Sequence, residues 1–207
     1  MTLTAVVSAE ARSNLHALAE LARRRNLSVA LSRLPVGCTR FVCDHTDALL
    51  CAPGSGHNHQ AWPGGYLDHL DEVCGAAGAL HDAMSALRPL PFTVDDALLV
   101  LFLHDVEKVF KRLPDGCRHD PVYARLVADP RALQERVCVD YELSLTAEQR
   151  NALRYVHGEG DDYRKDKRVM GPLAAFCHMC DVWSARGWPD EPAVGGPLPL
   201  TLTTFPA

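Results

Sequence analysis

The amino-acid sequence predicts an all-α protein, and two observations support this prediction. Of its 207 residues, 47% are hydrophobic and only 7% are aromatic, so the core is built mostly from Leu, Val and Ala, two of which are strong helix formers. Apolar residues also recur every three or four positions over long stretches, which is the period of an amphipathic helix. At this length a single domain is expected, and we assign residues 1–207 to one.

Two helices are predicted in the first half of the chain. The first follows Ser8 and ends in the basic cluster 23–25, where positive charge complements the helix dipole. The second begins after Gly64 and Gly65 and continues with a regular apolar face until Pro89 stops it. We expect this second helix to pack one face against the core.

A third helix begins at Thr93, because a threonine hydroxyl is a favourable N-cap, and it continues to Val109 or Phe110. Its stretch 97–103 is entirely apolar. A helix that is apolar on all sides is surrounded by other elements, so we expect this one to lie at the centre of the fold.

Two further helices are predicted in the second half of the chain. Thr146 and Gln149 have the spacing of a capping box, and the helix that they begin stops at Gly158. The last helix runs over 172–186, and the Pro- and Gly-rich tail from Pro189 is expected to be irregular.

The segment 27–56 has no clear helical period. It contains several residues that interrupt regular structure, namely Pro35, Gly37, Pro53, Gly54 and Gly56. We therefore expect a loop-rich N-terminal segment with short strands.

Charge and composition narrow the classes of function. The net charge of −5 disfavours binding to an extended nucleic acid. Eight cysteines are too few for a disulfide scaffold, and the first twelve residues lack the pattern of a signal peptide, so a reducing cytoplasm is predicted. The longest apolar run, 97–103, is far shorter than the ~18 residues of a membrane span. No membrane association is expected.

Polar residues within apolar helices indicate the site. His104 and Asp105 end the most apolar stretch of the chain, and Asp181 and His69 also lie among apolar neighbours. Each residue alone has an ordinary structural explanation, but a buried carboxylate is costly unless a cation or hydrogen bonds compensate it. Together, two imidazoles and two carboxylates form a ligand set suited to a hydrolytic divalent metal, such as Mn²⁺, Co²⁺, Mg²⁺ or Zn²⁺.

Three sequence segments also resemble the H…HD…D motifs of the HD-domain metal-dependent phosphohydrolases: Gly64-Gly65-Tyr66-Leu67-Asp68-His69, Leu103-His104-Asp105-Val106-Glu107-Lys108 and His178-Met179-Cys180-Asp181. The similarity covers roughly residues 50–187. It is greatest to the branch with a His-His pair before the Gly-Gly turn, since His59 stands ten residues before His69, and Tyr155-Val156-His157-Gly158 is similar to that branch's Ser-His-His-Gly. The resemblance implies an HD-domain helical bundle.

The resemblance also implies roles for individual residues. His69, His104, Asp105 and Asp181 would hold the metal. The chain departs from the family pattern at Gln60, where a second His is expected, and at Glu107, where a Gly commonly precedes the Lys that corresponds to Lys108.

The hypothesis that follows is hydrolysis of a phosphoester in a small nucleotide by a metal-activated water. Asp105 would orient the water, His157 would contact phosphate or protonate the leaving oxygen, and Lys108 would neutralise developing charge. Candidate substrate contacts are Trp62, His59, Lys165 and Arg168.

Several alternatives stay open at this stage. A 3′ to 5′ exoribonuclease, a cyclic-nucleotide phosphodiesterase and a catalytically silent nucleotide-binding module all fit the same ligand residues. Cys177 and Cys180 have metal or redox spacing, but no second pair accompanies them and both are expected to be core thiols. A homo-oligomer is compatible with the sequence and is not specified by it.

Overall fold

The computed structural model describes residues 23–57, 59–111 and 121–191, and within these ranges it contains helices and no β-strand. The all-α prediction is confirmed. The helix predicted after Ser8 and the tail beyond residue 191 lie outside the described residues. No helix in the described ranges is long and apolar enough to span a membrane.

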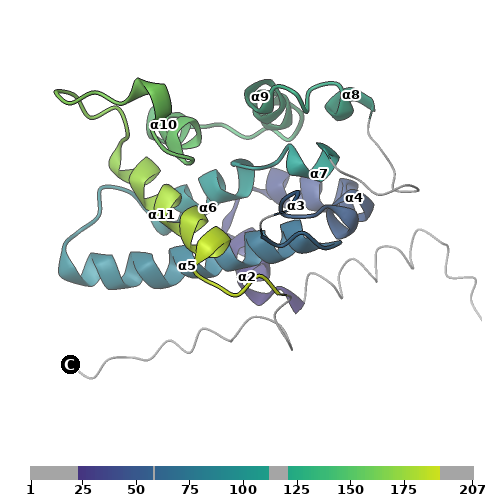
Figure 1. The fold of residues 1–207 in the computed structure, drawn as a ribbon, viewed down its shortest axis with the longest axis horizontal. Helices are drawn as coiled ribbons and strands as arrows, with labels where there is room; N and C mark the ends of the chain where they lie inside the picture. Colours follow the sequence, from purple (N-terminus) through teal and green to yellow (C-terminus); the bar gives the residue numbers. More distant parts are fainter. Residues whose placement is uncertain (1–22, 58, 112–120, 192–207) are drawn as a thin grey trace, which may run out of the picture.

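Helix α6 (Val94–Leu103) is the axis of the fold (Figure 1). Every residue from Ala97 to Leu103 is buried, because helices contact α6 from several sides. These partners are α2 (Arg25–Arg33), α5 (Gly65–Leu87), α10 (Ala147–Tyr155) and α11 (Pro172–Arg186). The predicted central position of this helix is confirmed.

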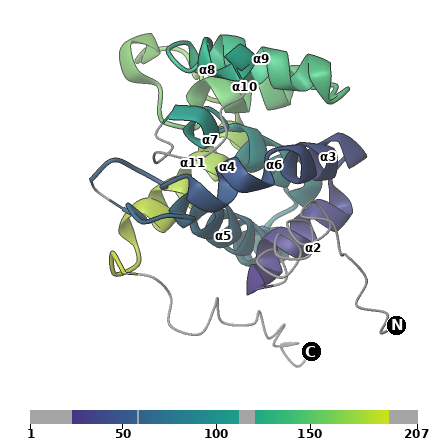
Figure 2. The ribbon, with the colours of Figure 1, turned by 90° about the vertical axis from the view of Figure 1, so that its right-hand side faces the viewer.

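Two layers enclose the axis (Figure 2). One layer contains α8 (Pro121–Ala124), α9 (Pro130–Asp140) and α10, and α2 and α5 lie on the opposite side of α6. The short helices α3 (Val36–Asp44), α4 (Thr46–Cys51) and α7 (Lys108–Lys111) complete the bundle, and a single 3₁₀ turn spans Gly160–Asp162. The site described below lies where α6 ends between these layers.

Most predicted helix boundaries are confirmed. Helix α11 has the predicted limits, and α5 begins at Gly65. Thr93 accepts a hydrogen bond from the backbone N–H of Asp96, in a complete capping box at the start of α6. Thr146 and Gln149 form the predicted capping box at the start of α10, but this helix ends at Tyr155, three residues before the predicted stop at Gly158.

The expectation of a loop-rich segment with short strands over 27–56 is wrong, because α2, α3 and α4 occupy most of it. The residues that interrupt regular structure stand mainly at helix boundaries. Pro35 separates α2 from α3, and Pro53 and Gly54 follow the end of α4. Short helices leave too few turns for their period to be visible in the sequence, and packing of buried side chains such as Phe41 stabilises them.

The predicted continuation of the third helix to Val109 or Phe110 is also wrong. Helix α6 ends at Leu103, and turns over 104–107 precede α7. The backbone there forms i to i+3 hydrogen bonds, such as that from the Lys108 N–H to the Asp105 carbonyl at 2.9 Å. This tighter geometry turns the chain immediately after the central helix.

The pair Gly64–Gly65 sets the start of α5. Gly64 has a φ of 77°, the left-handed region that glycine adopts without strain. A Cβ on Gly65 would lie 2.0 Å from the carbonyl oxygen of Gln60, so only glycine fits there. The loop before α5 therefore packs directly on the helix that carries His69.

We expect Gly65→Ala to lower the thermal unfolding midpoint strongly and to reduce metal binding. The new methyl group would clash with backbone, and overpacking costs about 1–3 kcal/mol or more. The exposed Ala79→Gly on the same helix is the control, since it costs only about 1 kcal/mol of helix propensity. Equal midpoints for the two variants, measured by circular dichroism, would contradict this account.

Candidate metal centre

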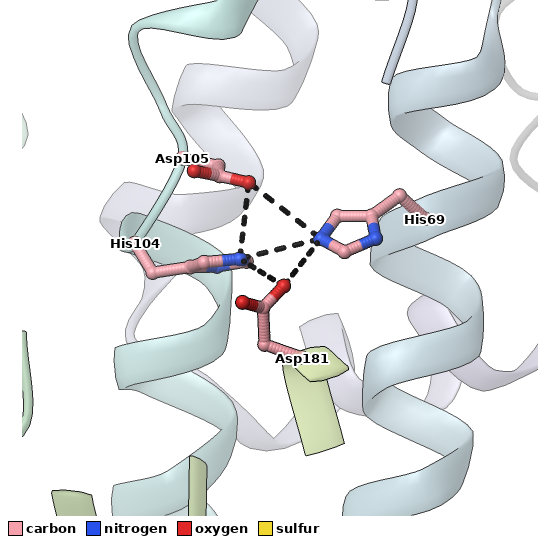
Figure 3. Close-up of side chains that lie close together, drawn as sticks. All are labelled: His69, His104, Asp105 and Asp181. Carbon is pink, nitrogen blue, oxygen red and sulfur yellow. Dashed lines mark hydrogen bonds and ion pairs between the residues drawn. The ribbon is translucent and has the colours of Figure 1, made fainter. Parts of the chain in front are cut away.

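Four buried or nearly buried side chains converge from three helical segments (Figure 3). His69 comes from α5, His104 and Asp105 from the end of α6, and Asp181 from α11. One ligand atom from each residue lies within 4.8 Å of the others. The predicted convergence of these residues is confirmed, and the set can hold one divalent cation.

The distances within this cluster, named here the His/Asp cluster, are short. The Nε2 atoms of His69 and His104 are 3.2 Å apart, and each lies 3.4 Å from Oδ1 of Asp181. Oδ2 of Asp105 lies 3.2 Å from His104 Nε2 and 3.7 Å from His69 Nε2. All four atoms therefore surround a single point.

The break in the helix after Leu103 makes this arrangement possible. Consecutive residues of an α-helix point about 100° apart, so a regular helix would not direct both His104 and Asp105 to one point. The turn after α6 brings the two side chains together. Gln134 on α9 holds this turn, since its Nε2 donates to the His104 carbonyl at 2.9 Å.

Hydrogen bonds at the outer ring nitrogens orient both imidazoles. His104 Nδ1 lies 2.7 Å from the Leu101 carbonyl, which can only accept, so Nδ1 carries the proton. His69 Nδ1 lies 3.0 Å from the hydroxyl of Ser184, which donates its own proton to Glu72 at 2.7 Å, so His69 Nδ1 also donates. In the neutral rings, both Nε2 lone pairs then point into the cluster.

The cluster requires positive charge. Neutral imidazoles and ionised carboxylates present four acceptor atoms and no donor among themselves, which is unfavourable in a buried site. A divalent cation satisfies all four atoms at once. The donor set therefore fits a metal ion on the chemistry of its own atoms.

The pKa shifts of the four cluster residues agree with this need for positive charge. Burial lowers the pKa of His69 to about 4. Burial alone would also lower the pKa of His104, but the Asp105 and Asp181 carboxylates outweigh it and raise that pKa to about 10. Burial opposes ionisation of both carboxyls, yet the neighbouring histidines hold their pKa values below the usual range. Without a metal, a proton on His104 supplies the positive charge.

Two further predicted residues border the cluster. Lys108 Nζ lies 2.5 Å from Oδ2 of Asp105, and His157 Nε2 lies 3.3 Å from the other oxygen, Oδ1. The His157 side chain is 58% exposed. It therefore stands between the buried ligands and the solvent, where a substrate can reach it.

His59 and Gln60 lie on the other side of His69. The ring centroids of His59 and His69 are 6.0 Å apart, and the role of His59 as a substrate contact stays a prediction. Both ring nitrogens of His59 are buried and have no hydrogen-bond partner in the part of the chain that the structure describes. Gln60 donates to Glu72 at 2.7 Å and so supports the Ser184 hydroxyl that orients His69.

Among the described residues, three predicted substrate contacts form no hydrogen bond or ion pair with the cluster. Trp62 donates its indole N–H to Asp68 at 2.7 Å. Lys165 and Arg168 are exposed between α10 and α11, and neither has an ion pair or side-chain hydrogen bond with another described residue. Their roles in substrate binding stay predictions. Cys177 and Cys180 are both buried, as expected of core thiols.

A cavity of about 620 Å³ opens beside the cluster, and sequence analysis did not anticipate it. Its walls come from α9 and α10, and His104 and His157 form its boundary with the cluster. Three arginines line it, Arg131, Arg150 and Arg154. Arg131 lies on α9, and Arg150 and Arg154 lie one turn apart on α10, so only the tertiary structure brings the three arginines to one cavity.

Comparison with protein-family models, with curated proteins and with solved structures finds no significant match to this chain. Its class is therefore defined by the site itself: an all-helical protein with a buried His/His/Asp/Asp cluster compatible with a metal ion.

We expect the protein to bind about one divalent ion per chain and His69→Ala to lose it, because the substitution removes one of four ligands. His81→Ala is the matched control, since His81 lies on the same helix and bonds to the Phe92 carbonyl instead. Plasma mass spectrometry of the purified proteins measures the metal. Equal metal content in the two variants would refute the assignment.

Metal binding at pH 8 should release about one proton per ion. His104, with a pKa of about 10, is protonated before binding, whereas His69, with a pKa of about 4, has no proton to lose. Metal affinity should therefore increase as the pH rises toward 10. Calorimetry in two buffers of different ionisation enthalpy counts the protons, and a count near zero would contradict the protonation assigned to His104.

Proposed function

We propose that the protein is a metal-dependent phosphohydrolase of the HD-domain type that cleaves a phosphoester in a small nucleotide. The observation that carries this proposal is the set of four acceptor atoms around one buried point, with no donor of their own. The motif resemblance of residues 50–187 supports the family. A divalent cation bound by His69, His104, Asp105 and Asp181 supplies positive charge for a phosphate oxygen and lowers the pKa of a water molecule.

The charges at the site favour an anionic substrate. The two carboxylates contribute −2 and Lys108, in contact with Asp105, contributes +1. A divalent cation makes the sum of these groups +1. A phosphate group is then attracted to the site, and the low polarity of the surroundings strengthens that attraction.

Three side chains have distinct tasks in the proposed reaction. Asp105 accepts a hydrogen bond from the attacking water and orients it. Lys108 stabilises the charge that develops on the phosphate oxygens. His157, which is exposed and within 3.3 Å of Asp105, donates a proton to the leaving oxygen.

The size of the cavity supports a small substrate. Pockets for small molecules commonly have volumes of about 300–1,000 Å³, and the cavity beside the cluster measures about 620 Å³. The net charge of −5 disfavours a long polyanion. A mononucleotide is therefore the preferred substrate over RNA.

The experiment that tests the function is a screen of nucleoside mono- and triphosphates, cyclic nucleotides and single-stranded RNA with Mn²⁺, Co²⁺, Mg²⁺ and Zn²⁺, with products identified by chromatography. Turnover of a mononucleotide is expected, with only a modest loss between ~50 and ~200 mM salt. His157→Ala should lower kcat by about 10²–10⁴-fold while it retains bound metal, because it removes an acid and no ligand. His81→Ala is the control.

Other outcomes decide between the alternatives. Salt-sensitive shortening of RNA without mononucleotide turnover would overturn the choice of substrate. Nucleotide binding without turnover under any metal would identify a silent binding module. Metal loss in His157→Ala equal to that in His69→Ala would assign His157 to the ligands.

A further inference from the structure

Glu107 lines the cavity beside the His/Asp cluster, and one of its carboxyl oxygens is buried without a donor among the described residues. Glu107 is only 7% exposed and lines the cavity, and its Oε2 atom is buried with no hydrogen-bond partner among the described residues. A buried carboxylate oxygen without a donor is unfavourable. Because the Glu107 side chain lines a cavity, a ligand bound there can supply the donor that this carboxyl group lacks.

The neighbouring polar side chains of the cavity already have partners. Asn151 donates to the Val169 carbonyl and accepts from the Gly171 N–H. Gln134 donates to the His104 carbonyl. These two side chains hold the backbone in place. They do not supply the donor that Glu107 lacks.

Two of the three arginines in the cavity are also paired. Arg154 forms an ion pair with Asp162 at 2.6 Å, and Arg131 pairs with Glu135 at 3.4 Å. Arg150 has no side-chain partner among the described residues, and its charge is close enough to Cys138 across the cavity to affect the pKa of that thiol. The cavity thus combines one acceptor and one cation that a ligand can engage.

The remaining walls are apolar or aromatic. Pro130, Leu145, Leu153 and Tyr155 contribute to the lining. A flat heterocycle is compatible with such walls, since apolar and aromatic side chains form most of the surface of small-molecule sites. A ligand that fits all three features carries an apolar ring, an N–H or O–H donor and an electronegative group.

We propose that this cavity binds the nucleoside part of the substrate, and that Glu107 selects substrates by accepting a hydrogen bond from a sugar hydroxyl or a base amino group. Arg150 contacts a carbonyl or a further phosphate of the same ligand. The identification of the ligand as a nucleotide rests on the proposed function. Glu107 is thereby a specificity residue, and the reaction itself takes place at the neighbouring cluster.

The test compares Glu107→Met, which removes the acceptor with little change in size, with Glu135→Met as the matched control. Glu135 lines the same cavity, but its side chain is 62% exposed and paired with Arg131. Binding of nucleoside 5′-phosphorothioates, which hydrolyse slowly, is measured by calorimetry. The ligands are a complete nucleotide, its 2′-deoxy and 3′-deoxy forms, and a purine form without the amino group.

Of the three ligands that lack one donor, the wild type should bind one at least about tenfold more weakly than the complete nucleotide. That ligand leaves the Glu107 carboxyl without a donor. The altered ligand that binds weakly identifies the sugar or the base as the source of the donor. Glu107→Met should lose this discrimination and Glu135→Met should keep it. Glu107→Gln, which retains an acceptor oxygen, should keep part of it.

A stability measurement separates a binding role from a structural one. Without ligand, Glu107→Met should raise Tm by a few degrees, because it removes a buried unpartnered carboxylate. A lower Tm, with discrimination unchanged, would overturn the inference. A second bound metal ion that is present in the wild type and absent from Glu107→Met would also overturn it, since Glu107 would then be a metal ligand.

A separate assay tests the proposed function without relying on the role of Glu107. Hydrolysis of bis(4-nitrophenyl) phosphate by the wild type tests the metal centre with a substrate that has no N–H or O–H donor. If the wild type hydrolyses no phosphoester but Glu107→Met still loses discrimination in binding, the pocket is confirmed and the enzymatic proposal is wrong. If the wild type hydrolyses phosphoesters but binds the complete and the altered nucleotides equally well, the enzymatic proposal stands and the role of Glu107 is wrong.

Discussion

The structure depends on the compensation of buried negative charge at the end of α6. Asp105 and Asp181 lie within 3.4 Å of imidazole nitrogens in the interior of the bundle, where an unpaired carboxylate is strongly unfavourable. A proton on His104 or a bound cation supplies the missing positive charge. The cluster joins α5, the end of α6 and α11, so the positive charge at its centre also holds these helices together. The charge balance of the site and the packing of the three helices are therefore coupled.

A second set of polar residues maintains the geometry of the cluster. Glu72 accepts from both Ser184 and Gln60, and Ser184 in turn orients His69. The Gln60 carbonyl packs against Gly65 at the start of the helix that carries His69. The loop before α5 thus acts on the metal ligands in two ways, through side-chain hydrogen bonds and through backbone contact. Gln60 thus supports the metal ligand His69 indirectly, through Glu72 and Ser184.

The central helix explains why a small, weakly aromatic protein can bury such a polar site. Contacts from α2, α5, α10 and α11 exclude water from Ala97–Leu103, and the turn after Leu103 then directs two adjacent polar side chains into the same interior. The cavity between α9 and α10 is the side from which a ligand can approach. His157 lies at the boundary between this cavity and the cluster, so one exposed residue contacts both environments.

The sequence by itself determined the helical class, the central position of α6 and the four residues of the cluster, because these features depend on local signals. An all-apolar run is buried wherever it occurs, capping residues mark helix ends locally, and polar residues within apolar helices are conspicuous. Only the tertiary structure decided that most of 27–56 is helical, that α6 breaks at His104, and that Glu107 and Arg150 line a cavity. Short helices take much of their stability from packing against distant residues, and a cavity is formed by the surfaces of elements that are separated in the chain. Neither property has a local period or motif from which it can be read.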